Sequence, residues 1–172
     1  MHGRQVHGVQ IIGPSEAVHD HSEALVCATV ASPDDPGRRL DLTQRLGVPP
    51  ERYATLVHPA AVVPGSASVG PGSIVHATTV LTADVTLGAH VAVMPAVVLT
   101  HDDVVGDGVT FGAGARVAGG VTIEAGAYIG SGALLREGLV VGAGAVIGMG
   151  TVLTKSVPAG EVWVGTPARR LR

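Results

Sequence analysis

The sequence Val105-Gly-Asp-Gly-Val-Thr, Phe111-Gly-Ala-Gly-Ala-Arg, Val117-Ala-Gly-Gly-Val-Thr122 shows a six-residue pattern that repeats 17 times, without insertion, between Val57 and Pro158. The first position of each hexad is aliphatic, or phenylalanine at Phe111. The fifth position is Ala, Ser, Thr or Val, except at Asp103 and Leu139. Because the phase is never lost, the period reflects structure rather than composition.

A period of six is too short for a pair of solenoid helices and fits short strands joined by tight turns. The pattern predicts a mainly β fold, a parallel β-helix of about five to six triangular coils, with three hexads per coil. Residues 18 apart then stack at the strand spacing of about 4.8 Å. Strand side chains alternate, so the first and fifth positions point inward, and the turn falls at the third and fourth. Periodicity alone does not give the hand of the coil, although parallel crossovers are normally right-handed.

Composition supports a narrow prism filled by aliphatic side chains, because only four of the 172 residues are aromatic while 46% are hydrophobic. A net charge of −3 without a basic run argues against a nucleic-acid or anionic-membrane partner. The single Cys27 excludes a disulfide framework and is expected in a buried strand. No apolar run reaches the ~20 residues of a membrane span and no signal peptide is visible, so a cytoplasmic location is expected.

Residues 1–56 are expected to form a small α/β segment before the β-helix at 57–158 and a C-terminal tail at 159–172. The pattern predicts a short strand over 9–12, a buried strand over 24–30 and a helix over 38–46 that ends at Gly47. The polar run 32–36 is expected to supply side-chain capping oxygens to that helix.

The hexads, the Val57-His58-Pro59 entry and the Gly165-Thr-Pro-Ala168 exit resemble the hexapeptide-repeat acyltransferases. The closest resemblance is to the branch that acetylates nucleotide-linked amino sugars, with its sialic-acid O-acetyltransferase relatives. It implies a left-handed β-helix, acetyl-CoA as co-substrate and a homotrimer with sites between subunits. In that branch the N-terminal domain starts with a strand and a glycine-rich turn ending in His-Gly. Met1-His2-Gly3-Arg4 matches at most the end of this motif, so either the α/β segment is truncated or this protein holds its acceptor differently.

The turn pair His101-Asp102 is the strongest candidate for catalysis. Histidine is a suitable base near neutral pH, and a neighbouring carboxylate fixes its tautomer and raises its basicity. The resemblance implies that His101 is the general base and Asp102 its supporting acid. Gly119 lies 18 residues further on, hence one coil above, and the resemblance implies that its N–H is an oxyanion donor. Asp103, at an inward position, competes with Asp102 for His101 or bonds to turn amides.

The resemblance also implies a coenzyme site, in which this sequence has Thr110, Ser131 and Met149. Gly130 and Gly148 belong to glycine columns that leave flat backbone for a pantetheine arm. Lys155 is expected near the coenzyme phosphates, as are the arginines of the tail. Two positions depart from the family, because Thr110 replaces a typical histidine and Met94 replaces a polar residue.

One outward-facing column of sixth positions is almost entirely aliphatic, which is typical of a partner surface on a water-soluble protein. It predicts that the homotrimer contact borders His101. The column contains Val62, Val80, Val98, Arg116, Leu134 and Val152.

The function that these residues predict is direct acetyl transfer from acetyl-CoA to the amino group of an amino sugar, since the corner offers no Cys or Ser nucleophile. Three alternatives stay open: O-acetylation of a sugar hydroxyl, a zinc-dependent enzyme like the γ-class carbonic anhydrases, and a scaffold without catalysis. The stacked His58 and His76 raise the zinc alternative. The γ-class carbonic anhydrases bind zinc through three histidines, two of them closely spaced on one coil. No such closely spaced pair occurs in these repeats, so no metal is expected.

Overall fold

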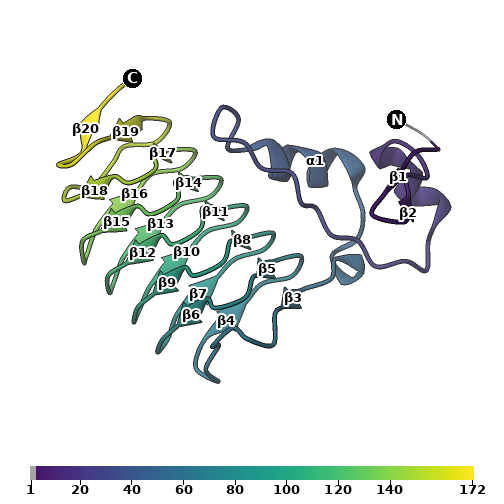
Figure 1. Ribbon diagram of the computed structural model, residues 1–172, viewed down its shortest axis with the longest axis horizontal. Coiled ribbons are helices and arrows are strands. Elements are labelled where there is room, and N and C mark those ends of the chain that lie inside the picture. Colours follow the sequence, from purple (N-terminus) through teal and green to yellow (C-terminus); the bar gives the residue numbers. More distant parts are fainter. Residues whose placement is uncertain (1–2) are drawn as a thin grey trace.

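Most hexads fold as a strand of two residues followed by a tight turn, and three hexads complete one coil of a left-handed parallel β-helix (Figure 1). The computed structural model describes residues 3–172; Met1 and His2 of the expected His-Gly motif lie outside the described residues. Strand partners are 18 residues apart as far as Leu153, as in the pairs Val104 with Thr122 and Val105 with Ile123. Beyond it the spacing shortens to 16, where Val141 bridges Val157 and Val146 pairs with Val162. The predicted architecture is therefore confirmed, and so is its register up to the last hexad.

The three faces of the prism are three parallel sheets, each named here after its strand in the coil of residues 98–115. The β10 sheet contains β4 (Ser68–Val69), β7 (Thr86–Leu87), β10 (Val104–Val105), β13 (Thr122–Ile123) and β16 (Val140–Val141). The β9 sheet contains β6 (Val80–Leu81), β9 (Val98–Leu99), β12 (Arg116–Val117), β15 (Leu134–Leu135) and β18 (Val152–Leu153). The β11 sheet contains β3 (Leu56–Val57), β5 (Ile74–Val75), β8 (Ala92–Val93), β11 (Thr110–Phe111), β14 (Tyr128–Ile129) and β17 (Val146–Ile147), and then β19 (Val162–Val164) and the antiparallel β20 (Arg169–Arg170).

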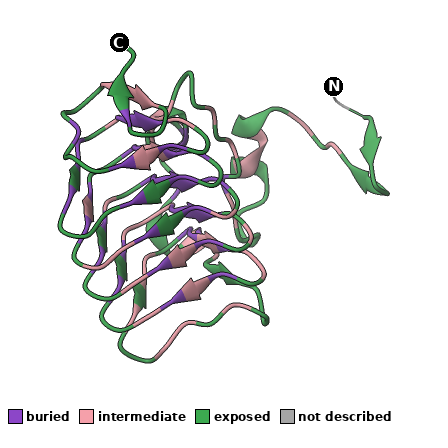
Figure 2. Ribbon diagram, turned by 60° about the vertical axis from the view of Figure 1, so that its left-hand side comes forward, coloured by how far each residue is buried: buried purple, intermediate pink, exposed green. Residues whose placement is uncertain are grey.

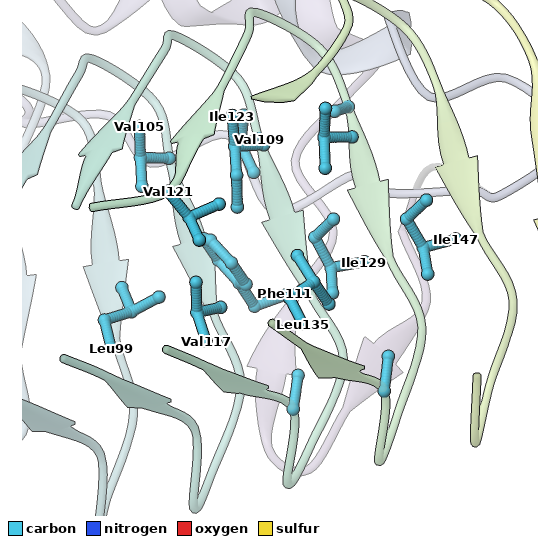
Figure 3. Packing of buried hydrophobic residues seen from close by; sticks show 14 of the residues in the cluster. Leu99, Val105, Val109, Phe111, Val117, Val121, Ile123, Ile129, Leu135 and Ile147 are labelled. Carbon is cyan, nitrogen blue, oxygen red and sulfur yellow. The ribbon is translucent and has the colours of Figure 1, made fainter. Parts of the chain in front are cut away.

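The interior of the prism is filled by the first and fifth positions of the hexads, as predicted. Leu99, Val105, Phe111 and Val117 are buried and point toward one another from the three sheets (Figure 3). The fourth position of most turns has a positive φ, which places the turn in the type II class. Glycine supplies this conformation in the later coils, whereas Asp102 adopts it with φ of 60°.

The segment before the coils differs in part from the prediction. The helix α1 (Arg38–Leu46) ends at Gly47 in the left-handed conformation, as predicted, but its N-cap is Gly37 and no side chain caps it. The polar run 32–36 instead forms a local turn, in which Ser32 Oγ accepts a hydrogen bond from Asp34 N at 3.2 Å. The remaining elements are β1 (Gln5–Val6), β2 (Val9–Gln10), and two short 3₁₀ helices, η1 (Ser15–Asp20) and η2 (Pro50–Arg52).

The predicted buried strand over 24–30 is wrong. Only Val26 pairs, in a single bridge with Tyr53, and Leu25 is 70% exposed. Within residues 3–172 this apolar run pairs with no second strand beyond that bridge. Cys27 is only half-buried, outside any strand. Of the strand predicted over 9–12, only β2 forms, and it pairs with β1 in an antiparallel hairpin. This hairpin projects away from the coils (Figure 2).

A buried arginine attaches α1 to the β-helix. The Arg39 side chain is 2% exposed, and its guanidinium donates to Val30 O at 3.1 Å, His90 O at 2.7 Å and Thr110 Oγ1 at 2.8 Å. Burial lowers the pKa of this guanidinium. The helix thereby covers the β11 sheet and leaves the outer face of the β9 sheet uncovered. Among residues 3–172, no helix is long and apolar enough to cross a membrane.

Candidate active site

The candidate site lies at the corner between the β9 and β10 sheets, where the turn after β9 carries His101 and Asp102. Residues 18 apart form a column along this corner, because each coil repeats the turn one strand spacing higher. From the first coil upward the third positions of this column are Gly65, Ala83, His101, Gly119, Glu137 and Lys155. This column defines what surrounds the histidine above and below.

His101 and Asp102 are in direct contact, with 2.7 Å between Nδ1 and Oδ2. Both side chains are about two-thirds exposed, at 67% and 66%, so a substrate can reach them. When Nδ1–H donates to the carboxylate, the lone pair of the neutral imidazole lies on Nε2. The pair can therefore accept a proton at Nε2 and stabilise the imidazolium that results.

Gly119 lies against the imidazole one coil above. A Cβ at this position would overlap His101 Cε1 and Nε2, so the ring in this orientation requires glycine there. Gly120 N donates to His101 O at 2.9 Å, which ties the two turns together. Within residues 3–172, the Gly119 N–H has no hydrogen-bond acceptor, so it is available to a ligand beside Nε2.

Asp103 does not compete for His101. Its side chain is 0% exposed inside the prism, and Oδ1 accepts from Val121 N at 2.9 Å, one coil above. Oδ2 is buried and has no partner among the described residues. Burial raises the pKa of Asp103 to about 7. Of the two alternatives left open by the sequence, the structure selects the bond to a turn amide.

The expected coenzyme residues lie on more than one corner. Lys155 is exposed on the His101 corner, three coils above the histidine, which corresponds to about 14 Å at the usual strand spacing. Ser131 and Met149 are exposed at the corner between the β11 and β9 sheets. The β9 sheet separates these two corners in one chain.

Gly130 and Gly148, which are expected to leave flat backbone for the pantetheine arm, are required for packing between coils. A Cβ at Gly130 would meet the backbone of Met149, and one at Gly148 would meet the Val164 side chain. Their identity therefore follows from the close approach of successive coils. Met94, also a departure from the family, is partly exposed on the same side as these glycines.

The coenzyme role expected for Thr110 does not fit the structure. Thr110 is 6% exposed on the β11 sheet, opposite the His101 corner, and its hydroxyl accepts from Arg39. A coenzyme group would have to displace this guanidinium, so we leave Thr110 out of the site. Arg39 was not identified from the sequence, where an arginine in an amphipathic helix looks like any solvated cation.

The stacked His58 and His76 line one shallow hollow, and the third histidine of the coils outside the candidate site is His90. His90 packs edge-on against Tyr53, with ring centroids 4.5 Å apart, under the N-terminal segment, and burial lowers its pKa. His58 Nδ1 accepts from Ala60 N at 3.0 Å. Residues 3–172 contain no group of three or more His, Cys, Asp or Glu side chains placed to hold a metal ion.

The aliphatic column of the β9 sheet faces outward, as its spacing predicts. Val62 is 56% and Leu134 is 44% exposed, whereas Val80, Val98 and Val152 are half-buried. Arg116 interrupts the column in its middle. We refer to these six residues as the β9 stripe, and it runs directly up to the turn that carries His101.

Comparisons with known proteins agree with this fold. The family model for the bacterial transferase hexapeptide (six repeats) matches residues 104–137. WeeI from Acinetobacter baumannii AYE is 30% identical, with 99% of this chain and 82% of that chain covered and a TM-score of 0.84.

The acetyltransferase domain of PglB from Neisseria gonorrhoeae FA1090, in complex with acetyl coenzyme A, is 29% identical over 99% of this chain and 82% of that one, with a TM-score of 0.82. PerB from Caulobacter crescentus, in complex with CoA and GDP-perosamine, is 25% identical over 97% and 81%, with a TM-score of 0.87. A search of curated protein sequences gave no match. By its repeats and by this similarity over almost its whole length, the chain belongs to the hexapeptide-repeat acyltransferase family.

Proposed function

We propose that this protein transfers the acetyl group of acetyl-CoA to the amino group of an amino sugar that is carried on a nucleotide. The observation that supports this most is the contact of the His101 ring with Gly119, which sets a base beside a free backbone N–H. The PglB domain binds acetyl coenzyme A, and PerB binds CoA together with GDP-perosamine, a nucleotide-linked amino sugar.

In this mechanism the amine nitrogen of the acceptor attacks the thioester carbonyl while His101 Nε2 removes its proton. Asp102 orients the imidazole and stabilises its charged form. The carbonyl oxygen becomes an oxyanion and accepts from Gly119 N–H. When the C–S bond breaks, the electron pair leaves with the CoA sulfur, which takes up the proton held by His101. The products are the N-acetylated sugar and free CoA.

The coenzyme is proposed to bind between two subunits of a homotrimer that associates through the β9 stripe. Lys155 of the His101 corner would contact its phosphates, because the column sets this ammonium about 14 Å above the base. The backbone of Gly130, Ser131, Gly148 and Met149 would contribute from the adjacent chain. An apolar stripe beside the catalytic turn supports this arrangement, since two chains bring the two corners together across one interface.

The test is a thiol-release assay with acetyl-CoA and a panel of nucleotide-linked amino sugars, each paired with its analogue that carries a hydroxyl in place of the amine. We expect release only with amines, and a loss of about 10²–10⁴-fold in kcat for His101→Ala. His58→Ala is the matched control, because His58 lies in the first coil, away from the His101 corner. This variant should retain activity. Normal turnover by His101→Ala would refute the proposal, as would a wild-type protein whose melting temperature does not respond to acetyl-CoA.

A further inference from the structure

The buried carboxyl of Asp103 lies directly behind the catalytic turn and is not used by the mechanism above. Inward fifth positions are otherwise apolar or carry a hydroxyl in the described coils, and Asp103 is the only one with a carboxyl. A buried carboxyl is unfavourable for stability unless it is well paired, and only its Oδ1 has a partner. Because this carboxyl lowers the stability of the fold, its presence is better explained by a role in function than by a role in folding.

The partner of Asp103 belongs to the turn that presents the oxyanion donor. Val121 follows Gly119 and Gly120, and its N–H is bonded to the Asp103 carboxylate and not to the carbonyl of Ala118, three residues before it. Several later turns do close with such a bond of their own, as Ala133 N does to Gly130 O at 3.1 Å. The Gly119–Gly120 turn is therefore held from the coil below.

This turn needs an external support because two consecutive glycines are the most flexible pair of residues that a turn can have. Its orientation depends on four bonds between coils. Gly120 N donates to His101 O, Gly138 N donates to Gly119 O, Val104 N donates to Val121 O, and Val121 N donates to the Asp103 carboxylate. Only the last of these comes from a side chain, and it starts from the residue two positions after the general base.

We infer that Asp103 is a positioning residue, which fixes the Gly119 N–H relative to His101 by holding the Val121 amide. This inference rests on the proposed acetyl transfer, because it assigns a purpose to the Gly119 donor. Through this bond, the segment that carries the base and the segment that carries the oxyanion donor move as one unit. The effect is on the transition state alone, since the oxyanion does not exist in the bound substrate.

The chain contains its own precedent for the contact. Ser73 is also the inward fifth residue of its hexad, at another corner of the prism, and its Oγ accepts from Val91 N, also 18 residues on, at 2.9 Å. A serine at position 103 can therefore reach the same amide without a carboxyl. Valine is equally compatible with the prism, since Val85, Val97 and Val109 fill this position and are buried.

The experiment compares wild type with Asp103→Val and Asp103→Ser by steady-state kinetics and by thermal unfolding. For Asp103→Val we expect kcat to fall by about 10-fold to 100-fold, as for a small misplacement of a catalytic group. The KM for acetyl-CoA should stay within about 2-fold, because ground-state binding does not use the oxyanion donor. The melting temperature should be unchanged or higher. Asp103→Ser should restore kcat to within about 3-fold of wild type.

Wild-type kcat in Asp103→Val would overturn the inference, and so would an equal loss in the valine and serine variants. If the valine variant does not fold, Asp103→Ala replaces it, because alanine also occupies this inward position in Ala115 and Ala133. Amide hydrogen exchange at Val121 gives a readout independent of activity and should be faster in the valine variant. An inactive wild type would overturn the proposed function instead, and the exchange rate would still decide whether Asp103 holds the turn.

Discussion

Replacing Asp103 with asparagine is expected to change how the stability of the protein depends on pH. Asparagine keeps the acceptor that meets Val121 N and removes the ionisable group. Burial raises the pKa of Asp103 from 3.8 to about 7 in the folded protein. Between these values the folded state holds a proton that the unfolded state has released, so stability falls as pH rises.

The size of the effect follows from the same two values. One pKa unit corresponds to about 1.4 kcal/mol, so a shift from 3.8 to about 7 corresponds to at most about 4 kcal/mol. The group is fully buried, so solvent screening does not reduce this figure strongly. The wild-type free energy of unfolding should decline from about pH 4 to about pH 7, relative to Asp103→Asn, and the difference should be constant above that range.

The assay is denaturant unfolding from pH 4 to pH 8 at one fixed protein concentration, because oligomerisation would make stability depend on concentration. Asp84→Asn is the matched control, an exposed carboxylate at the turn one coil below, where the difference from wild type should stay small at every pH. If the difference between wild type and Asp103→Asn changes by less than about 1 kcal/mol over this range, the carboxyl does not experience the environment described here.

Three further perturbations test the site and its supports. Gly119→Ala should lower kcat at least about 10²-fold with a nearly unchanged melting temperature, because the added methyl group displaces the His101 ring. Gly65→Ala in the same column is the control: its methyl group meets open space, so kcat should not change. Arg39→Leu should release residues 3–56 to limited proteolysis while the coils keep their melting transition, since Val30 O, His90 O and Thr110 Oγ1 lose the guanidinium donor. Val98→Glu should shift the protein to a smaller species in light scattering, because it sets a charge in the centre of the β9 stripe; an unchanged mass would exclude this face as the contact.

The coils could be predicted from the sequence because an unbroken period of six fixes the register of every strand. Once residues 18 apart are known to stack, the position of Gly119 above His101 follows without any structure. The N-terminal segment could not be predicted in this way. The run 24–30 is apolar enough for a buried strand, yet in the described part of the chain it has no partner strand, and that depends on contacts distant in sequence.

The choice of the acid partner and the burial of Thr110 also depend on side-chain geometry that sequence spacing does not contain. Asp102 and Asp103 are neighbours in sequence, but one points outward from the turn and the other into the prism. Thr110 is at an outward position, where exposure is the ordinary expectation. It is buried because Arg39, 71 residues earlier, folds back over the β11 sheet. Such long-range contacts override the local pattern.

The position of the site along the solenoid explains how an unfavourable residue such as Asp103 can be kept. The stability of a solenoid is approximately a sum of contacts between adjacent coils, so an unfavourable residue weakens mainly its own coil and the next. Asp103 lies in the middle of the stack, where fully buried aliphatic layers such as Val85 below and Val121 above continue the core on both sides. A buried carboxyl in a terminal coil would instead destabilise the end of the prism, which has a neighbouring coil on one side only. A central coil is therefore the place where a carboxyl can support the catalytic corner at the expense of local stability, and the pH dependence of unfolding measures how large that expense is.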